Sequence, residues 1–457
     1  MNRIRRVAVL AISAMACVVL GSASNAGAQA PAGQDTGGGK QPYTMPEYNA
    51  EQACGADKNP TSQVKCLDDF VSKYPNSNLL PFVYPMYFQA YTQMKNWPKV
   101  IESADKALAL GDKLEPAVRY QADFARAVAY SNIPVDEKNP AAKENARKAR
   151  EGALDGLKTL NSIQKPANLS DDDWTKQKQQ PSVFLNGVAA NAAMTMQDYP
   201  AAIASYKAVI ALVPGDVVSN YQIGKAYLAM NPSQHDDAFW QFAVAVTSKS
   251  ATQQQATEIK KYLRRLIAGY QGGNVCDSLT DAELNELLQL AGSSAERPTT
   301  FKIASGADLT NAQKDMTIAS VISDLKASGD KAKITWLASC GLEFPDVPGK
   351  LLEVTAGATA TDPVTLKLAF VTSDAEFEAA TTPNMEVKVV GQAEAAKLDK
   401  GTTPAPRFTG TLVSYDPDPA FMVHFDKAKI NTEDLPKEKA PVKKPPVRKP
   451  VAKKPAA

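Results

Sequence analysis

The distribution of apolar and polar residues over most of the chain follows the period of an α-helix. Residues 183–246 show the clearest pattern, which predicts two helical hairpins in tandem, with small residues at close helix crossings and rings between hairpins. The positions that define it are Ala189, Ala190, Ala202, Tyr206 and Pro214 in the first hairpin, and Gly224, Tyr227, Ala238, Phe242 and Ala245 in the second. Ala190 and Gly224 are equivalent positions one period of about 34 residues apart, which indicates a structural repeat.

Further helices are predicted on both sides of this stretch, at 66–74, 81–110 as a hairpin, 115–130, 141–160, 252–270 and 277–291. Asn96 and Asp198 each precede an aromatic residue and a proline, so both are predicted N-caps of second helices in a hairpin. Residues 131–140 are interpreted as a long linker and residues 161–180 as a polar insertion. The helical array as a whole is assigned to residues 51–296.

From residue 297 the pattern changes. A helix is predicted at 307–328, and from Ile334 onward short β-branched or alternating runs predict strands at 351–355, 364–372, 385–390, 408–415 and 421–425. Five short strands at this spacing predict a small closed barrel or sandwich within 297–436, and an OB-type barrel is one candidate.

Both ends of the chain are predicted to lie outside the folded domains. Arg3, Arg5 and Arg6 precede an apolar run at 7–20, and small residues follow it, so 1–28 is predicted to be a signal peptide. Cys17 lacks the sequence context of a lipidation site, so we do not expect a lipoprotein. Residues 29–50 are rich in Gly, Pro and Gln and are predicted to be a flexible leader.

Four cysteines remain after the predicted signal: Cys54, Cys66, Cys276 and Cys340. An even number in an exported chain favours two disulfides, and the most economical pairing is Cys54–Cys66 and Cys276–Cys340. Zinc is the alternative, but no two of these cysteines lie two to four residues apart. We predict disulfides and no metal site.

Charge is unevenly distributed along the chain. The formal net charge is +2, and it becomes −1 without the three arginines of the predicted signal. Residues 437–457 hold eight basic residues and one acidic residue in a Lys-Pro-Ala sequence, so the rest of the chain has a net charge of −8. We predict a disordered tail that is a solvated spacer, lies on the acidic body, or binds anionic lipid or cell-wall polymer. Nucleic acid is not an expected partner, because the chain is predicted to be exported and the tail has no interleaved aromatic residue for base stacking.

The sequence offers little for catalysis. Its two histidines, His235 and His424, are far apart, and no Gly-x-Ser-x-Gly, phosphate-binding glycine loop or His-Glu-x-x-His occurs. Asp171, Asp172 and Asp173 could bind a cation, but a helix N-terminus capped by Ser170 explains them more simply. Asp416 and Asp418 are interpreted as a turn. We therefore predict no catalytic residues and no cofactor.

The repeat pattern resembles the tetratricopeptide repeat (TPR) family, and the ending at Tyr74-Pro75-Asn76-Ser77 resembles the inter-repeat turn of exported envelope members. The resemblance implies an α-helical solenoid whose first helices line a concave peptide groove. In the register that the resemblance gives, the groove-facing candidates are Gln89, Arg119, Asp123, Asn191, Tyr221 and Lys225. A solvated helix face without a ligand remains an equal alternative.

Together these patterns predict a multidomain chain with a TPR-like array of αα-hairpins, a small β-rich domain and disordered termini. The expected function is a non-catalytic scaffold for protein–protein interaction in the periplasm or cell envelope. Its expected partners are protein or peptide segments. The alternative is a ligand-binding or enzymatic module in the β domain, with acids such as Asp374, Glu376 and Glu378, carried on the helical platform.

Overall fold

The computed structural model describes residues 43–133, 141–273, 275–359, 361–417 and 419–436. The predicted signal peptide, residues 29–42 of the predicted leader, the basic tail 437–457 and Asp418 lie outside the described residues. Two compact units are present. The helical unit comprises the described residues up to Lys261 together with Leu287–Pro298, and the barrel unit comprises Tyr262–Glu286 and the described residues from Thr299.

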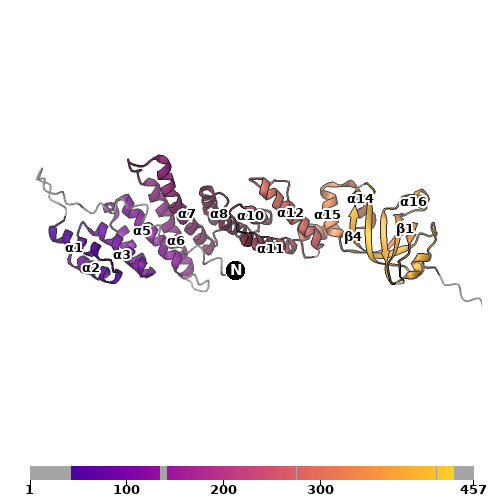
Figure 1. Cartoon of the computed structure of the whole chain (residues 1–457), viewed down its shortest axis with the longest axis horizontal. Coiled ribbons are helices and arrows are strands. Elements are labelled where there is room, and N and C mark those ends of the chain that lie inside the picture. The colour runs from indigo at the N-terminus through magenta and orange to yellow at the C-terminus, as the bar shows by residue number, and fades with distance from the viewer. Residues whose placement is uncertain (1–42, 134–140, 274, 360, 418, 437–457) are drawn as a thin grey trace, which may run out of the picture. The chain divides into compact units, whose positions relative to one another are not determined.

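The helical unit contains ten helices that follow one another along the chain (Figure 1). They are α1 (Met45–Ala56), α2 (Pro60–Lys73), α3 (Leu80–Gln93), α4 (Trp97–Leu108), α5 (Pro116–Asn132), α6 (Ala141–Ser162), α7 (Asp171–Met196), α8 (Tyr199–Leu212), α9 (Val217–Ala229) and α10 (His235–Thr247), with a 3-10 turn η2 (Gly111–Lys113) before α5. The next two helices, α11 (Gln253–Tyr270) and α12 (Asp277–Ser293), are divided between the units.

Packing in the helical unit is between neighbours in sequence. Each helix from α1 to α10 contacts the next one, and α3 also contacts α5, as α5 contacts α7. The core is correspondingly divided into several small clusters rather than one. This arrangement agrees with the predicted tandem hairpins.

Second helices of the hairpins begin at the predicted caps. Asn96 Oδ1 accepts a hydrogen bond from the backbone N–H of Lys99 at 3.4 Å, and Asp198 Oδ1 accepts one from Ala201 at 3.3 Å. Each cap is followed by a proline in the first turn, where no intrahelical hydrogen bond is lost. The local sequence thus determines where α4 and α8 start.

Small residues allow close helix crossings at the predicted positions. A Cβ atom on Gly224 of α9 would lie 2.9 Å from the ring of Phe242 on α10, which only a glycine avoids. Tyr227 is half-buried, and Pro214 is exposed in the turn after α8. The remaining members of the pattern are buried: Ala189, Ala190, Ala202, Tyr206, Gly224, Ala238, Phe242 and Ala245.

The helical boundaries differ from prediction at two places. Residues 45–50, assigned to the flexible leader, form the first turns of α1, because Thr44 and Glu47 make a reciprocal capping box. Half of the predicted insertion 161–180 belongs to α7, which starts at Asp171 and continues through Pro181, and its first two residues end α6. The Gln179 side chain donates to the carbonyl of Leu212 at the end of α8, so the extension is helical and contacts α8 near Pro181.

After its parts of α11 and α12, the barrel unit contains three short helices, α13 (Gly306–Gln313), α14 (Ile318–Ala327) and α15 (Gly329–Ser339). The single helix predicted at 307–328 is divided into α13 and α14, because Thr317 caps a new helix. Five strands follow: β1 (Glu343–Thr355), β2 (Val364–Phe370), β3 (Met385–Val389), β4 (Arg407–Asp416) and β5 (Met422–Ile430), with α16 (Asp374–Ala379) before β3 and a 3-10 turn η3 (Ala393–Lys397) after it. The prediction of strands from Ile334 onward was wrong for α15, a helix that buries Ala332, Thr335 and Leu337.

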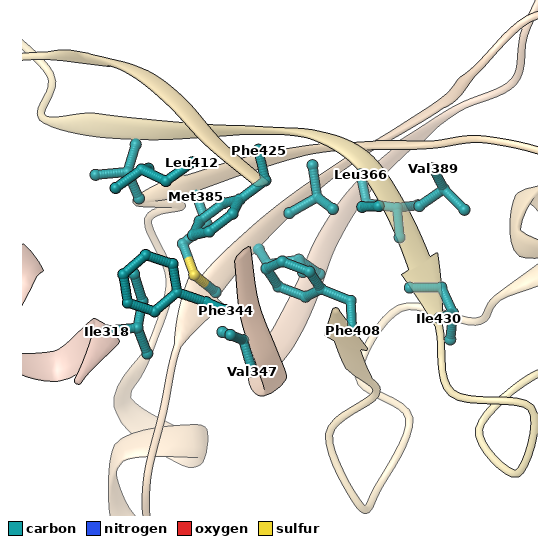
Figure 2. Close-up of a cluster of buried hydrophobic side chains, with 14 of the residues drawn as sticks. Ile318, Phe344, Val347, Leu366, Met385, Val389, Phe408, Leu412, Phe425 and Ile430 are labelled. Atoms are coloured by element: carbon teal, nitrogen blue, oxygen red, sulfur yellow. The ribbon is translucent and has the colours of Figure 1, made fainter. Parts of the chain in front are cut away.

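The strands close into a barrel in the order β1-β2-β3-β5-β4, in which β3 and β5 are parallel and every other pair is antiparallel. Their inward side chains and Ile318 of α14 form one continuous apolar core (Figure 2). The rings of Phe344 and Phe408 pack edge-on against Phe425 at 6.3 and 5.0 Å between centroids. Of the two predicted alternatives, barrel or sandwich, the closed barrel is the one that forms.

β1 bends sharply and pairs with two different strands. Its first half, Glu343 to Pro348, pairs with β4, and its second half, from Gly349, pairs with β2. Asp346 has a positive φ of 54° in a bulge within the first half, between Phe344 and Val347. At Gly349 a Cβ atom would lie 2.9 Å from Leu368 and Met385, so glycine permits the close approach to β2.

Both disulfides of the economical pairing are present. Cys54–Cys66 joins α1 to α2, and Cys276–Cys340 joins the start of α12 to the end of α15. With the helical array assigned to 51–296, the second bridge would connect the array to the next domain, but both of its cysteines lie in the barrel unit. The boundary predicted at 296/297 therefore differs from the structure, since Tyr262–Glu286 belongs to the barrel unit.

Candidate functional site

Four of the predicted groove-facing residues keep accessible side chains on the first helices of the hairpins. Gln89 on α3 and Asn191 on α7 are exposed, and Tyr221 and Lys225 on α9 are half-buried. Asn191 Oδ1 accepts a hydrogen bond from the Tyr206 hydroxyl at 2.8 Å, which fixes the orientation of its amide. Gln89, Asn191 and Lys225 lie on three different helices, and Tyr221 lies one turn before Lys225 on α9.

Arg119 and Asp123 on α5 have structural roles instead. The Arg119 guanidinium donates to the carbonyl of Gly111 at 2.8 Å. Asp123 is only 3 % exposed and is packed against α6, where its Oδ2 accepts from Thr159 Oγ1 at 3.2 Å and its Cβ lies beside Gly156. The expectation that Asp123 faces a groove was therefore wrong: α5 presents this position to its partner helix.

The burial of Asp123 has an electrostatic consequence. Desolvation, followed by repulsion from Asp155, raises the pKa of this carboxyl from 3.8 to about 6, while the hydrogen bond from Thr159 opposes the shift. Its ionised form is thus unfavourable inside the folded helix pair. Asp123 is better described as a destabilising buried acid than as a ligand-binding residue.

Apolar side chains accompany the polar positions, two helical turns earlier. Phe82 precedes Gln89 by seven residues and is 48 % exposed, and Val218 precedes Lys225 by seven and is 47 % exposed. Residues seven apart share one helix face. Phe184 stands in the same relation to Asn191, half-buried against the ring of Phe124 at 5.0 Å. The same helix face on α3, α7 and α9 thus combines an apolar residue with a polar one, and the sequence reasoning missed the apolar member.

The barrel unit contains a histidine between two carboxylates. On β5, the Nδ1 atom of His424 lies 3.3 Å from Oε1 of Glu386 on β3. Its Nε2 atom lies 2.9 Å from Oδ2 of Asp416 on β4. The two ring nitrogens face opposite sides, so a single cation cannot contact both carboxylates through this ring. Within the described ranges no group of three or more His, Cys, Asp or Glu could hold a metal ion.

The two acidic runs considered from sequence are helix starts. Ser170 caps α7, with its hydroxyl 2.7 Å from Asp173 Oδ2, as in the simpler interpretation. Asp374, Glu376 and Glu378 lie on α16 and not in a loop, and Glu376 accepts from the backbone N–H and hydroxyl of Thr372 at 2.7 and 2.8 Å. These hydrogen bonds lower the pKa of Glu376.

A second buried acid was not anticipated. Glu283 on α12 is 4 % exposed; its Oε2 accepts from Gln271 Nε2 at 2.5 Å and its Oε1 lies 3.8 Å from Lys333 Nζ. Burial raises the pKa of this carboxyl. The group joins α12 to α15 inside the barrel unit, which gives it a structural explanation.

The barrel unit also has a hollow of about 470 Å³ at the bend of β1. We call it the β1 hollow; it is lined by Met316, Thr317, Ile318, Ala319, Phe344, Pro345, Asp346, Val347, Pro348, Phe370 and Thr372. No sequence pattern predicted this hollow. Pro345 and Pro348, which shortly precede the predicted strand 351–355, could have indicated it, since prolines within strands mark bulges and unpaired backbone.

No helix in the described part of the chain is both long and apolar enough to span a membrane. A scan against family models finds no match, and a search among curated proteins finds no similar chain.

Proposed function

We propose that the chain is a non-catalytic scaffold of the TPR type that binds protein segments along the first helices of its hairpins. The supporting observation is the packing order of the helical unit: each helix contacts its neighbour in sequence, and the first helix α5 also contacts the first helices α3 and α7. Such nearest-neighbour packing is typical of solenoids, whose successive first helices form extended binding surfaces.

The chemistry of these helices favours a peptide ligand. Phe82 and Val218 supply exposed apolar contacts, and Gln89 and Lys225 supply donors on the same faces. Apolar anchors next to polar groups at regular intervals suit a protein segment better than a small molecule, because a segment can use several units at once.

The two disulfides favour an oxidising, exported compartment. We propose the periplasm or cell envelope, since the first residues have the features of a signal peptide. The partners proposed are proteins of that compartment.

The test is crosslinking from a photoreactive residue placed at Lys225 or at Asn191, in cells that express the whole chain. We expect discrete adducts with one or a few envelope proteins. Val218→Glu should reduce their yield at least fivefold, because it places an uncompensated charge at an apolar contact. Leu154→Glu on α6 is the matched control, since Leu154 is 42 % exposed and lies on a second helix of a hairpin. No adduct at either position, or equal loss in both variants, would contradict the proposal.

A further inference from the structure

The β1 hollow has an apolar floor and an open, partly apolar rim. Ile318, Phe344 and Val347 form the floor and are buried, as Figure 2 shows for the same end of the core. Phe370 and Pro348 at the rim are half-buried and Pro345 is exposed. Rings and prolines around a hollow are the surface that recognises extended proline-rich segments, which are already ordered before they bind.

Acidic residues predominate next to the lining, and we call them the acidic rim. Asp315 directly precedes the lining residue Met316, and Asp374 and Glu376 follow the lining residue Thr372 within four positions; all three are exposed, as is Lys314. Asp346 lines the hollow itself, 3.6 Å from the guanidinium of Arg407. A ligand that combines prolines with several positive charges would complement this surface.

We propose that the β1 hollow is the docking site for the chain's own basic, proline-rich segment, residues 437–457. That segment contains eight basic residues and one acidic residue, with valines and prolines between them. Prolines and valines of the segment occupy the apolar hollow, and its lysines and Arg448 lie against the acidic rim.

The position at which the described chain stops supports this occupant. Asn431 donates to Asp346 Oδ1 at 2.6 Å, so the residues just after β5 contact the hollow's own lining. Asp434 then accepts from the backbone and guanidinium of Arg407 at 3.0 and 3.1 Å. The described chain therefore ends at Pro436, five residues after this contact with the lining, and an extended segment of 21 residues reaches about 65 Å, enough to return to the hollow.

Because the basic segment belongs to the same chain as the β1 hollow, a modest affinity is enough to keep the hollow occupied. A short linker keeps a tethered ligand at an effective concentration of roughly millimolar. Docking in cis thus needs only a few apolar contacts and a partly screened attraction between charges, which salt weakens.

The first experiment uses the full chain with a photoreactive residue at Ala319, which is exposed and lines the hollow. We expect adducts within one molecule to peptides from 437–457, with a yield independent of protein concentration and at least fivefold lower in 1 M salt. A photoreactive residue at Ala358, exposed in the β1–β2 loop outside the lining, is the matched control and should give few such adducts.

The second experiment measures binding of a fluorescent peptide of residues 437–457 to a chain that stops after Pro436. Ala319→Lys should weaken binding at least tenfold, because the added cation repels the peptide and fills the hollow, whereas Ala358→Lys should change it less than twofold. A peptide with its prolines and valines replaced by Gly and Ser should also bind at least tenfold more weakly, although its charge is unchanged.

Three results would overturn the proposal. Adducts at Ala319 that contain no residue from 437–457 would show that the hollow is empty or has another occupant. Adducts between two molecules that increase with concentration would assign the hollow to a second copy. Equal binding by the two lysine variants would show charge attraction without docking.

Discussion

The two units bury their apolar residues in different ways. In the helical unit the buried residues are divided among small clusters, each shared by neighbouring helices. In the barrel unit the strands share one large cluster, which extends from Ile318 of α14 to Ile430 at the end of β5, and a smaller cluster of Leu309, Leu337 and Ala338 lies between α13 and α15. Neighbouring helices can therefore lose contact locally, whereas the strands of the barrel depend on one shared interior.

This difference predicts how damage spreads. A disturbed helix crossing should weaken its own pair and the next one, as in other nearest-neighbour arrays. A disturbed barrel residue should weaken every strand, because closure couples them all. The predictions below test this contrast, beginning with the largest effect.

Phe425→Ala should have the largest effect on stability. Phe425 is 1 % exposed and contacts both Phe344 and Phe408, so its removal leaves a cavity that costs about 3–5 kcal/mol. Hydrogen exchange should accelerate in all five strands together and remain unchanged in α3–α10. Phe82→Ala, at an exposed ring, is the control and should alter neither unit. Acceleration confined to β5 would contradict the shared interior.

Removing the Cys276–Cys340 bridge with serines should cost about 4 kcal/mol, because the bridge closes a loop of 64 residues. The effect should be limited to the barrel unit, including the first turns of α12. The matched double variant replaces Cys54 and Cys66, whose bridge joins residues 12 apart in sequence. It should cost about 3 kcal/mol, and only α1 and α2 should be destabilised. Thermal unfolding with segment-resolved exchange would measure both, and destabilisation of α10 by the first variant would contradict the unit boundary.

Asp123→Asn should stabilise the α5–α6 pair as pH rises. The pKa of Asp123 is about 6 in the folded chain and 3.8 unperturbed, so the folded state binds the extra proton. The proton on Asp123 therefore adds its full contribution to the free energy of unfolding below about pH 4, and this contribution decreases as pH rises to about 6. Above that pH the chain has lost all of it, about 3 kcal/mol.

The difference in unfolding free energy between Asp123→Asn and wild type should therefore grow from near zero at pH 4 to at most about 3 kcal/mol at pH 7.5. Denaturant titrations at several pH values would measure it. Thr159→Val removes the hydrogen bond to Asp123 Oδ2 and should make the pH dependence of the chain steeper. A pH-independent difference between Asp123→Asn and wild type would show that the carboxyl is not buried as described.

Gly224→Ala should have the smallest effect, about 1–3 kcal/mol, from the contact between the new methyl group and the Phe242 ring. Exchange should accelerate in α9 and α10 and not in α3. Gly187→Ala on α7 is the control: a Cβ there meets nothing within 4 Å, so helix propensity should make this change stabilising by up to about 1 kcal/mol. A loss of stability spread over the whole helical unit would contradict nearest-neighbour packing.

The sequence predicted elements well where a single local rule decides. Asn96 and Asp198 identified the starts of α4 and α8, because a cap and a first-turn proline act within four residues. Strands β2 to β5 were placed within a few residues, because alternation is also local. The cysteine pairing followed from compartment and economy.

Prediction failed where distant partners decide. Residues 161–180 were interpreted as a polar insertion from their composition, but 171–180 are helical because α7 packs against α6 and α8 and Gln179 reaches Leu212. Ile334 begins a short apolar run that suits strand or helix equally, and burial against the rest of the unit selected the helix α15. Asp123 was placed by register alone, but α6 packs over it. The candidate peptide-binding face could therefore be predicted only where the hairpins are regular.

The parallel pairing of β3 with β5 restricts the order in which the barrel can form during synthesis, which starts at the N-terminus. One edge of β3 stays unpaired until β5, some forty positions later, is available. β4 also lacks its second partner until then, so the barrel cannot close. The hairpins, in contrast, can assemble as soon as each second helix is synthesised. A nascent chain that lacks β5 would therefore combine folded hairpins with a sheet whose open edges can pair with other chains. During synthesis or transport, the risk of aggregation is highest until β5 has joined the barrel.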